Sequence, residues 1–393
     1  MKNTFLNIFI SFLILMVLSL ILFPKEALEA AKGGINLWLF TITPSLLPFF
    51  IGSELLLQLG VVHFLGAFLE PIMRPLFNVP GSGSFAMAIG YTSGYPVGAQ
   101  VISRLWEENL CKTEEAERLM SFCNNSGPLF MLGAVAIGMF GSPQAGYMIM
   151  ASNYFAAITT GLFFRFYKKN SHKKSLTTKK FLNATIKKIN YTAEQNKKSL
   201  SAILSEAVVK STNTIIMIGG YVVLFSVVIE FLKLYKILDF LSYFLSPIFV
   251  LLGFDKSLIP AFISGLLEIT VGSNLISQVS APLEQKVILT SAIIAWGGIS
   301  IHGQVLGVIA KTKIKYFPYF IAKTIQFFLA ALYSHLLLTI LKFQEDNEIS
   351  HVFNPYTYKN SWDIFQFSSI IFIIVILTIL FFAIALKQYL QQH

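Results

Sequence analysis

Charged residues are scarce in this chain. Asp, Glu, Lys and Arg make up 13% of its 393 residues, whereas soluble domains carry about 25%. Hydrophobic residues make up 55%, and 37 residues are Phe. Several apolar runs reach the length of about 18 residues or more that a helix needs to cross a bilayer. The composition excludes an ordinary soluble protein, and the fold class that we predict is an all-α polytopic membrane protein.

Cysteines and catalytic motifs are also nearly absent. Cys111 and Cys123 are the only two cysteines, too few for a disulfide framework or a zinc site. No carboxylate cluster in the apolar segments demands a divalent metal, so we expect no metal and no cofactor. The chain lacks G-x-S-x-G, H-E-x-x-H and P-loop motifs, which removes common hydrolases and ATP-driven pumps. An intramembrane enzyme would have only Ser93, Glu268 and His302, at no recognisable spacing, so no enzyme is expected.

Two apolar segments are interrupted in their middle. Residues 83–104 and 118–141 are each long enough to span a membrane, yet each contains a cluster of glycine, proline and polar side chains. Proline removes a backbone donor, and glycine weakens a helix by about 1 kcal/mol relative to alanine. An unwound backbone persists in hydrocarbon only where protein or a water-filled cavity satisfies its polar groups. We therefore predict broken helices that line a cavity, as in many transporters. The predicted breaks are Gly94, Pro96, Gly98, Gly127 and Pro128.

The same pattern returns in the second half of the chain. Residues 257–279 and 287–310 are again apolar with a polar, glycine-rich middle, and Gly272 follows Gly98 by 174 residues (272 − 98 = 174). We interpret this as an internal duplication. An odd number of crossings per half would invert the second copy relative to the first. The sequence leaves open whether the broken segments cross fully or return as hairpins. The predicted second-half breaks are Gly272, Gly297 and Gly298.

About 10–12 hydrophobic segments divide the chain into five parts. An alternative, that residues 5–23 form a cleaved signal peptide, is disfavoured because their apolar run is long and more spans follow. The predicted parts are a leading transmembrane helix (1–36), a first repeat (37–167), a basic connector (168–204), a second repeat (205–341), and a loop with a trailing transmembrane helix (342–393).

The connector predicts the orientation in the membrane. It carries five pairs of adjacent lysines, from Lys168 and Lys169 to Lys197 and Lys198. The positive-inside rule places it in the cytoplasm, and counting crossings then places both termini there and the loop after the second repeat outside. A nucleic-acid role for such a run is the alternative, but affinity for anionic lipid head groups is the simpler interpretation.

Four sequence runs carry a resemblance to a known family. They are SGYPVGAQ from Ser93 to Gln100, NSGPLF from Asn125 to Phe130, LEITVG from Leu267 to Gly272, and WGGISIHGQ from Trp296 to Gln304. In this order and spacing, over about residues 5–345, the chain resembles the sporulation integral membrane protein YlbJ family. That resemblance implies two nucleoside-recognition Gate domains, related to those of concentrative nucleoside transporters. It also implies a mother-cell protein that moves dipicolinic acid across the outer forespore membrane.

Polar residues around the breaks are the candidate solute ligands. Dipicolinate is a flat aromatic dianion, and the exposed N-terminus of a half-helix attracts a carboxylate without a fixed positive charge. Ser, Thr, Asn and Gln side chains would donate or accept hydrogen bonds, and Tyr and Trp would stack on the ring. The alternative is that these groups only satisfy the broken backbone and hold helices together. The candidates are Ser93, Tyr95, Gln100, Asn124, Asn125, Ser126, Thr270, Asn274, Trp296, Ser300 and Gln304.

Glu268 and His302 are the candidate coupling residues. A carboxyl group inside a membrane must be paired, protonated or hydrated, which suits a proton-coupling group, and His302 in the partner break would share its proton. A structural Glu–His pair, or a carboxyl group bonded to backbone donors, is the alternative. A coupled Na⁺, as in many Gate-fold relatives, is also open.

These observations favour a secondary transporter for a small anionic solute, with dipicolinate as the solute that the resemblance implies. The alternatives are a nucleoside transporter and a non-transporting sporulation scaffold. The expected partners are the solute and the lipid bilayer, with no nucleic acid. A second copy of the chain or another sporulation protein is a further candidate partner.

Overall fold

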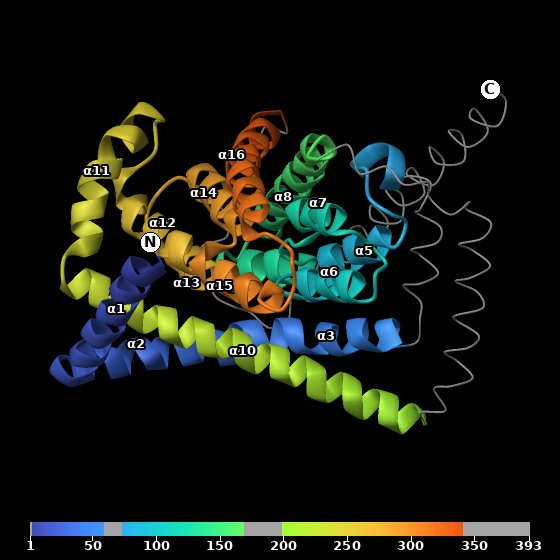
Figure 1. Ribbon diagram of the computed structural model, residues 1–393. Helices are drawn as coiled ribbons and strands as arrows, with labels where there is room; N and C mark the ends of the chain where they lie inside the picture. The colour runs from blue at the N-terminus through green and yellow to red at the C-terminus, as the bar shows by residue number, and fades with distance from the viewer. Residues whose placement is uncertain (1, 59–72, 169–198, 341–393) are drawn as a thin grey trace, which may run out of the picture.

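The computed structural model describes residues 2–58, 73–168 and 199–340 (Figure 1). Every regular element in these ranges is helical, which confirms the predicted all-α class. The basic connector and the trailing helix lie wholly or largely outside the described residues. So does one span of the first repeat, which the hydrophobic pattern predicts at residues 61–79.

A layer of long helices lies beneath a bundle of shorter ones in Figure 1. The layer consists of α1 (Lys2–Leu22), α2 (Pro24–Asn36), the π-helical η1 (Leu37–Ile42), α3 (Thr43–Gln58) and α10 (Leu200–Leu234). The helical turns run without interruption from Pro24 to Gln58, although the sequence predicts a span that begins at residue 37. Proline is favoured at the first position of a helix, and the Lys, Glu and Ala residues that follow Pro24 are good helix formers.

The two long helices of this layer run antiparallel. Gly34 in α2 packs against Ser226 in α10, where an added Cβ would lie 2.7 Å from the serine hydroxyl. Further along, Lys210 pairs with Glu54 of α3 at 2.8 Å. Residue numbers therefore rise along one helix as they fall along the other. Because α10 is the counterpart of α2–α3 at the 174-residue shift, the second repeat is inverted relative to the first.

The bundle repeats one set of elements twice. The first set is α5 (Gly83–Ser93), α6 (Val97–Glu107), α7 (Thr113–Cys123), the π-helical η2 (Phe130–Met139) and α8 (Pro143–Phe164). The second set is α12 (Ile259–Leu267), α13 (Ile269–Gln278), α14 (Leu283–Trp296), α15 (Gly298–Ile309) and α16 (Tyr316–Ile340), preceded by α11 (Ile237–Leu251) and the short 3₁₀ helix η3 (Lys256–Leu258). Apart from the loops that connect these segments, the first set leaves helix geometry at residues 94–96 and 124–127, and the second at the single residues Glu268 and Gly297.

The two kinds of break have different geometries. A Cβ added to Gly272 in α13 would lie 2.0 Å from the Cα of Gly265 in α12, whereas residues seven apart in one straight helix are separated by about 10 Å. The α12–α13 segment therefore folds back as a hairpin. Added Cβ atoms on Gly90 and Gly98 would both lie within 2.6 Å of the Cys123 carbonyl oxygen, so α5–α6 folds back in the same way. By contrast, α14 and α15 together form one candidate span across their break.

Within the described residues, four helical segments are long and apolar enough to cross a membrane. Three are α8, α10 and α16, and the fourth is the combined α14–α15 segment. A fifth candidate is formed if Ile10–Leu22 of α1 and the following segment Pro24–Ile42 are counted as one span, although the chain bends by 103° between them. Two of the interrupted segments, residues 83–104 and 257–279, therefore form hairpins of two half-helices rather than independent spans.

A buried carboxylate holds the ends of three helices together. Glu117 in α7 is 0% exposed and accepts hydrogen bonds from the Lys168 ammonium at 2.8 Å and the Tyr167 hydroxyl at 3.0 Å, just beyond α8. It also accepts one from the Lys315 backbone N–H at 3.2 Å, just before α16. The hydrogen bond to Glu117 raises the pKa of Lys168 above its usual value. The start of the basic connector is thus attached to the bundle.

The glycine contacts generate a prediction about stability. Gly272→Ala places a methyl group against the Gly265 backbone and should destabilise the hairpin by about 1–3 kcal/mol, the usual cost of overpacking. We expect a lower temperature of thermal unfolding for the purified protein in detergent.

Gly307→Ala is the matched control, because Gly307 is an exposed helical glycine with nothing within 4 Å of an added Cβ. It should leave the unfolding temperature unchanged or slightly raised. Equal unfolding temperatures for the two variants would contradict the hairpin contact.

Candidate functional site

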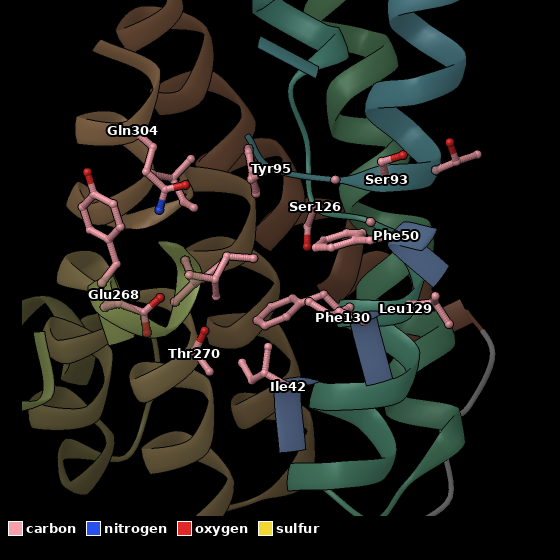
Figure 2. Close-up of a pocket in the computed structure, with 18 residues that line it drawn as sticks. Ile42, Phe50, Ser93, Tyr95, Ser126, Leu129, Phe130, Glu268, Thr270 and Gln304 are labelled. Atoms are coloured by element: carbon pink, nitrogen blue, oxygen red, sulfur yellow. The ribbon is translucent and has the colours of Figure 1, made fainter. Parts of the chain in front are cut away.

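Three of the four breaks, together with Ile301 and Gln304 of the helix that follows the fourth, line one cavity between the two repeats and the long-helix layer (Figure 2). Its volume is about 580 Å³, including the open mouth. Residues of the second repeat, among them Glu268, Thr270 and Gln304, face Ser93 and Ser126 of the first repeat across this space. The sequence thus correctly anticipates that the interrupted segments meet.

The rest of the cavity wall is mainly apolar. Ile42 and Phe50 of the long-helix layer contribute from η1 and α3, and Ile218 contributes from α10. Phe130 adds an aromatic face at the start of η2. A mostly apolar wall with a few convergent polar groups is the usual composition of a small-molecule site.

Two buried polar groups of the cavity wall have no partner within the described part of the chain. The Ser93 hydroxyl and the Gln304 side-chain oxygen make no hydrogen bond there, and the two residues are only 5% and 6% exposed. A buried polar group without a partner costs about 1–3 kcal/mol. Both groups are therefore available to a bound solute or to water.

Two of the half-helix N-termini at the breaks are already capped by side chains. The Asn124 side-chain oxygen accepts a hydrogen bond from the Ala99 N–H in α6 at 3.2 Å. The Glu268 carboxylate accepts one from the Val271 N–H in α13 at 2.7 Å. No side-chain cap is present at the N-termini of η2 and α15. Of these two helix ends, only the first lies at the cavity wall, where Gly127, Leu129 and Phe130 line it and backbone N–H groups are open to an anion. Residues 297–300 at the start of α15 are not part of that wall.

Glycine is required where the breaks turn. Gly94 has φ +81°, and Gly297 has φ +90°. This left-handed region costs other residues energy that glycine avoids. Both positions therefore match the predicted breaks, as do residues 124–127 ahead of Pro128, which starts the following helical turn. Pro96 lies in the first break, and Gly298 has φ +70° directly after the fourth.

Gly98 and Gly272 are corrections to the predicted breaks. Each lies inside a regular half-helix, in α6 and α13 respectively. Their absent side chains allow close backbone contacts, with the Cys123 carbonyl group in one repeat and Gly265 in the other. Packing, rather than interruption, explains why glycine recurs at the same place in both repeats.

The expected proton-sharing pair of Glu268 and His302 is wrong. The His302 ring makes hydrogen bonds with the Trp296 carbonyl oxygen at 3.1 Å and the Tyr316 hydroxyl at 2.8 Å. Both of its nitrogens are thus engaged, and neither contacts Glu268. The carboxylate instead caps α13, which is the structural alternative considered from the sequence, while it also lines the cavity.

Several candidate ligands lie away from the cavity wall. Gln100 is exposed on α6. Trp296 donates its ring N–H to the Leu266 carbonyl oxygen at 3.2 Å and packs on His302 at 4.3 Å between centroids, so its ring is already covered. The Asn124 amide group donates to the Tyr319 hydroxyl at 3.1 Å. The candidates that are not part of the cavity wall are Gln100, Asn124, Asn125, Asn274, Trp296 and Ser300.

The sequence analysis missed Lys323. This residue of α16 is 0% exposed, and its ammonium group donates to the Gln326 side-chain oxygen at 2.7 Å and to the Asn125 side-chain oxygen at 3.4 Å. It also lies 4.8 Å from the centroid of the Tyr95 ring. The signal available in the sequence was a lysine within an apolar span. A charged side chain inside a membrane is energetically costly and therefore usually belongs to a functional site.

Comparisons with known proteins agree with this architecture. The Gate family, described as nucleoside recognition, matches residues 39–166 and 215–313. The fold and the cavity therefore define an integral membrane protein with a Gate domain in two segments. The sporulation integral membrane protein YlbJ of Bacillus subtilis (strain 168) is 39% identical over 331 residues, which are 83% of this chain and 81% of that protein. The chain belongs to the YlbJ family of sporulation integral membrane proteins.

A second relative matches a shorter stretch. An uncharacterized protein of Alkalihalophilus pseudofirmus is 30% identical over 97 residues, which are 24% of this chain and 20% of that protein.

The capping role of Glu268 can be tested by stability. Glu268→Ala removes the acceptor for the Val271 N–H and should cost about 1 kcal/mol, as loss of an N-cap does. Glu268→Gln keeps a side-chain oxygen and should lose less. Thermal unfolding in detergent measures both variants.

Glu107→Ala, at an exposed glutamate in the last turn of α6, should not lower the unfolding temperature. If Glu268→Ala unfolds at the wild-type temperature, the carboxylate does not stabilise α13.

Proposed function

We propose that this protein is a secondary transporter for a small anionic solute. The observation that carries the proposal is the meeting of three helix breaks, and of the helix after the fourth, at one cavity that contains unpartnered, buried polar groups. Interrupted helices that meet between inverted repeats are the common architecture of a transporter's solute site. A scaffold would have no need of a cavity at this position.

Binding without chemistry fits the cavity better than catalysis. The Ser93 hydroxyl has no hydrogen-bond partner within the described ranges, so no base activates it. Glu268 is occupied as a helix cap, and His302 is held by Trp296 and Tyr316. A nucleophile needs an adjacent base or another means of activation. Movement of an unchanged solute is therefore the function that we assign.

Dipicolinate is the solute that we propose first. The uncapped N-terminus of η2 lies at the cavity wall and favours a negatively charged group. A flat dianion can place one of the two carboxylates that flank its ring nitrogen at this helix end, with its ring against the apolar wall. The family resemblance supports the same solute and, with it, the outer forespore membrane as the setting. The lysine pairs of the connector support cytoplasmic termini.

A nucleoside is the second candidate solute. The matching family is described as nucleoside recognition, and the cavity offers side-chain hydrogen bonds from Ser93, Thr270 and Gln304. A nucleoside is neutral, however, and makes no use of the free helix end at the cavity wall as an anion site. The two solutes can therefore be distinguished by charge.

Glu268 is the residue that we propose for coupling. Its carboxyl group lines the cavity and is only 3% exposed, so a proton or a Na⁺ ion that neutralises it would alter the charge beside the solute. This coupling step requires only one copy of the chain and no partner protein.

Flux in reconstituted liposomes tests the proposed function. Purified protein in proteoliposomes should take up labelled dipicolinate, and uridine more slowly. Gln304→Leu removes the cavity amide group, whose N–H can donate to a carboxylate, and should lower dipicolinate uptake about tenfold or more, since a hydrogen bond to a charged group contributes about 1.5–3 kcal/mol.

Gln100→Leu makes the same chemical change on the exposed face of α6 and should leave uptake near the wild-type rate. Equal effects of the two substitutions would favour the scaffold. Absence of flux for both solutes with well-folded protein would remove the transport assignment.

Imposed ion gradients test the coupling residue. Uptake by the wild type should respond to a proton or a sodium gradient, and Glu268→Gln should abolish that response, because the amide cannot gain or lose charge. The rate of solute exchange without a gradient should be less affected. A gradient response that persists in Glu268→Gln would exclude this carboxyl group as the coupling site.

A further inference from the structure

Lys323 is a buried cation with no acidic partner among the described residues. It lies on α16 with 0% of its surface exposed. The ion pairs found in the described ranges do not include it. Burying an ammonium group without a counter-ion costs several kcal/mol. Such a residue inside a membrane segment marks a functional site unless its partner is identified.

The groups around Lys323 accept its hydrogen bonds and present aromatic faces to it, and none of them is acidic. Its contacts are the side-chain oxygens of Gln326 and Asn125 and the ring faces of Tyr95, at 4.8 Å, and Tyr319, at 6.0 Å. Amide oxygens accept hydrogen bonds, and aromatic faces attract cations. None of these groups carries a negative charge, so the positive charge of a protonated Lys323 has no neutralising partner among its direct contacts.

Two of these contacts lead directly to the cavity. Tyr95 is part of the cavity wall, so a single side chain separates the ammonium group from the solute space. Asn125 precedes Ser126, which also lines the cavity. The charge is thus beside the wall, where water does not screen it.

Only the second repeat supplies this charge. Lys323 corresponds to Ile149 at the repeat shift (323 − 149 = 174), and Ile149 is a buried hydrophobic residue of α8. A lysine that served only to pack two equivalent helices would not need to differ in this way from its counterpart. The asymmetry indicates a role at the single cavity that both repeats share.

We propose that Lys323 is the positioning residue that makes the cavity select anionic solutes, in proportion to the negative charge that the solute carries. This inference rests on the proposed function and names the source of its charge preference. The lysine acts across Tyr95 rather than by direct contact. At a separation of about 8–10 Å and an effective dielectric constant of about 20, one such charge changes affinity on the order of tenfold for each ligand charge.

Binding of three matched pyridines tests this proposal. They are pyridine-2,6-dicarboxylate, pyridine-2-carboxylate and the neutral pyridine-2,6-dicarboxamide, with dissociation constants measured by calorimetry on the purified chain in detergent. Lys323→Gln keeps hydrogen-bonding capacity and removes the charge. It should weaken binding of the dicarboxylate about 100-fold and of the monocarboxylate about tenfold, and leave the diamide within about twofold.

The exposed lysine of η3 offers a control with the same chemical change, Lys256→Gln, which should alter none of the three constants. Equal weakening of all three ligands by Lys323→Gln would show a structural lysine and overturn the proposal. The wild type alone is also decisive if the variant does not fold: binding the diamide as tightly as the dicarboxylate, or binding neither anion, overturns it. Liposome flux is scored separately, so charge-selective binding without flux would remove transport but keep the anion site.

Discussion

The structure depends on one constraint, which is that backbone N–H and C=O groups in hydrocarbon must find partners within the protein. Each break frees several such groups, and side chains cap two of the half-helices that begin there. Asn124 reaches from one break to the first turn of α6, and Glu268 caps the helix that follows it. The tight contacts at Gly90, Gly98 and Gly272 bring hairpin backbones together so that lipid is excluded. The cavity is the space that remains between these capped and closely packed segments.

The two repeats cap their half-helices with polar residues at exchanged positions. At the repeat shift, Gly94 corresponds to Glu268, and Asn124 corresponds to Gly298. In the first repeat the cap of the hairpin's second helix comes from the neighbouring break, and in the second repeat it comes from the hairpin itself. Each repeat therefore has one polar cap and one glycine, at opposite positions. This exchange places a carboxylate on only one side of the cavity.

The sequence predicted the fold class, the duplication and the convergence of the breaks, because hydrophobic length and glycine or proline clusters reflect local backbone physics. It did not predict which side chains line the cavity. Gln100 and Trp296 lie beside breaks in sequence, but the direction of a side chain from a half-helix depends on tertiary packing. Lys323 lies far from every break in sequence, and only the folding of α16 against Asn125 and Tyr95 brings it to the site. The hydrogen bond between His302 and Tyr316 could not be predicted from the sequence for the same reason.

The divergence of the repeats has a consequence for how the site arose. An ancestral pair of identical halves of the first type would have had an isoleucine in place of the lysine and a glycine in place of the glutamate, and its central chamber would have been electrically neutral. Two halves of the second type would have carried both charges twice. The present combination of one acidic group and one basic group beside the cavity, Glu268 and Lys323, therefore depends on the difference between the two repeats, and a symmetric pair of either repeat would not have it.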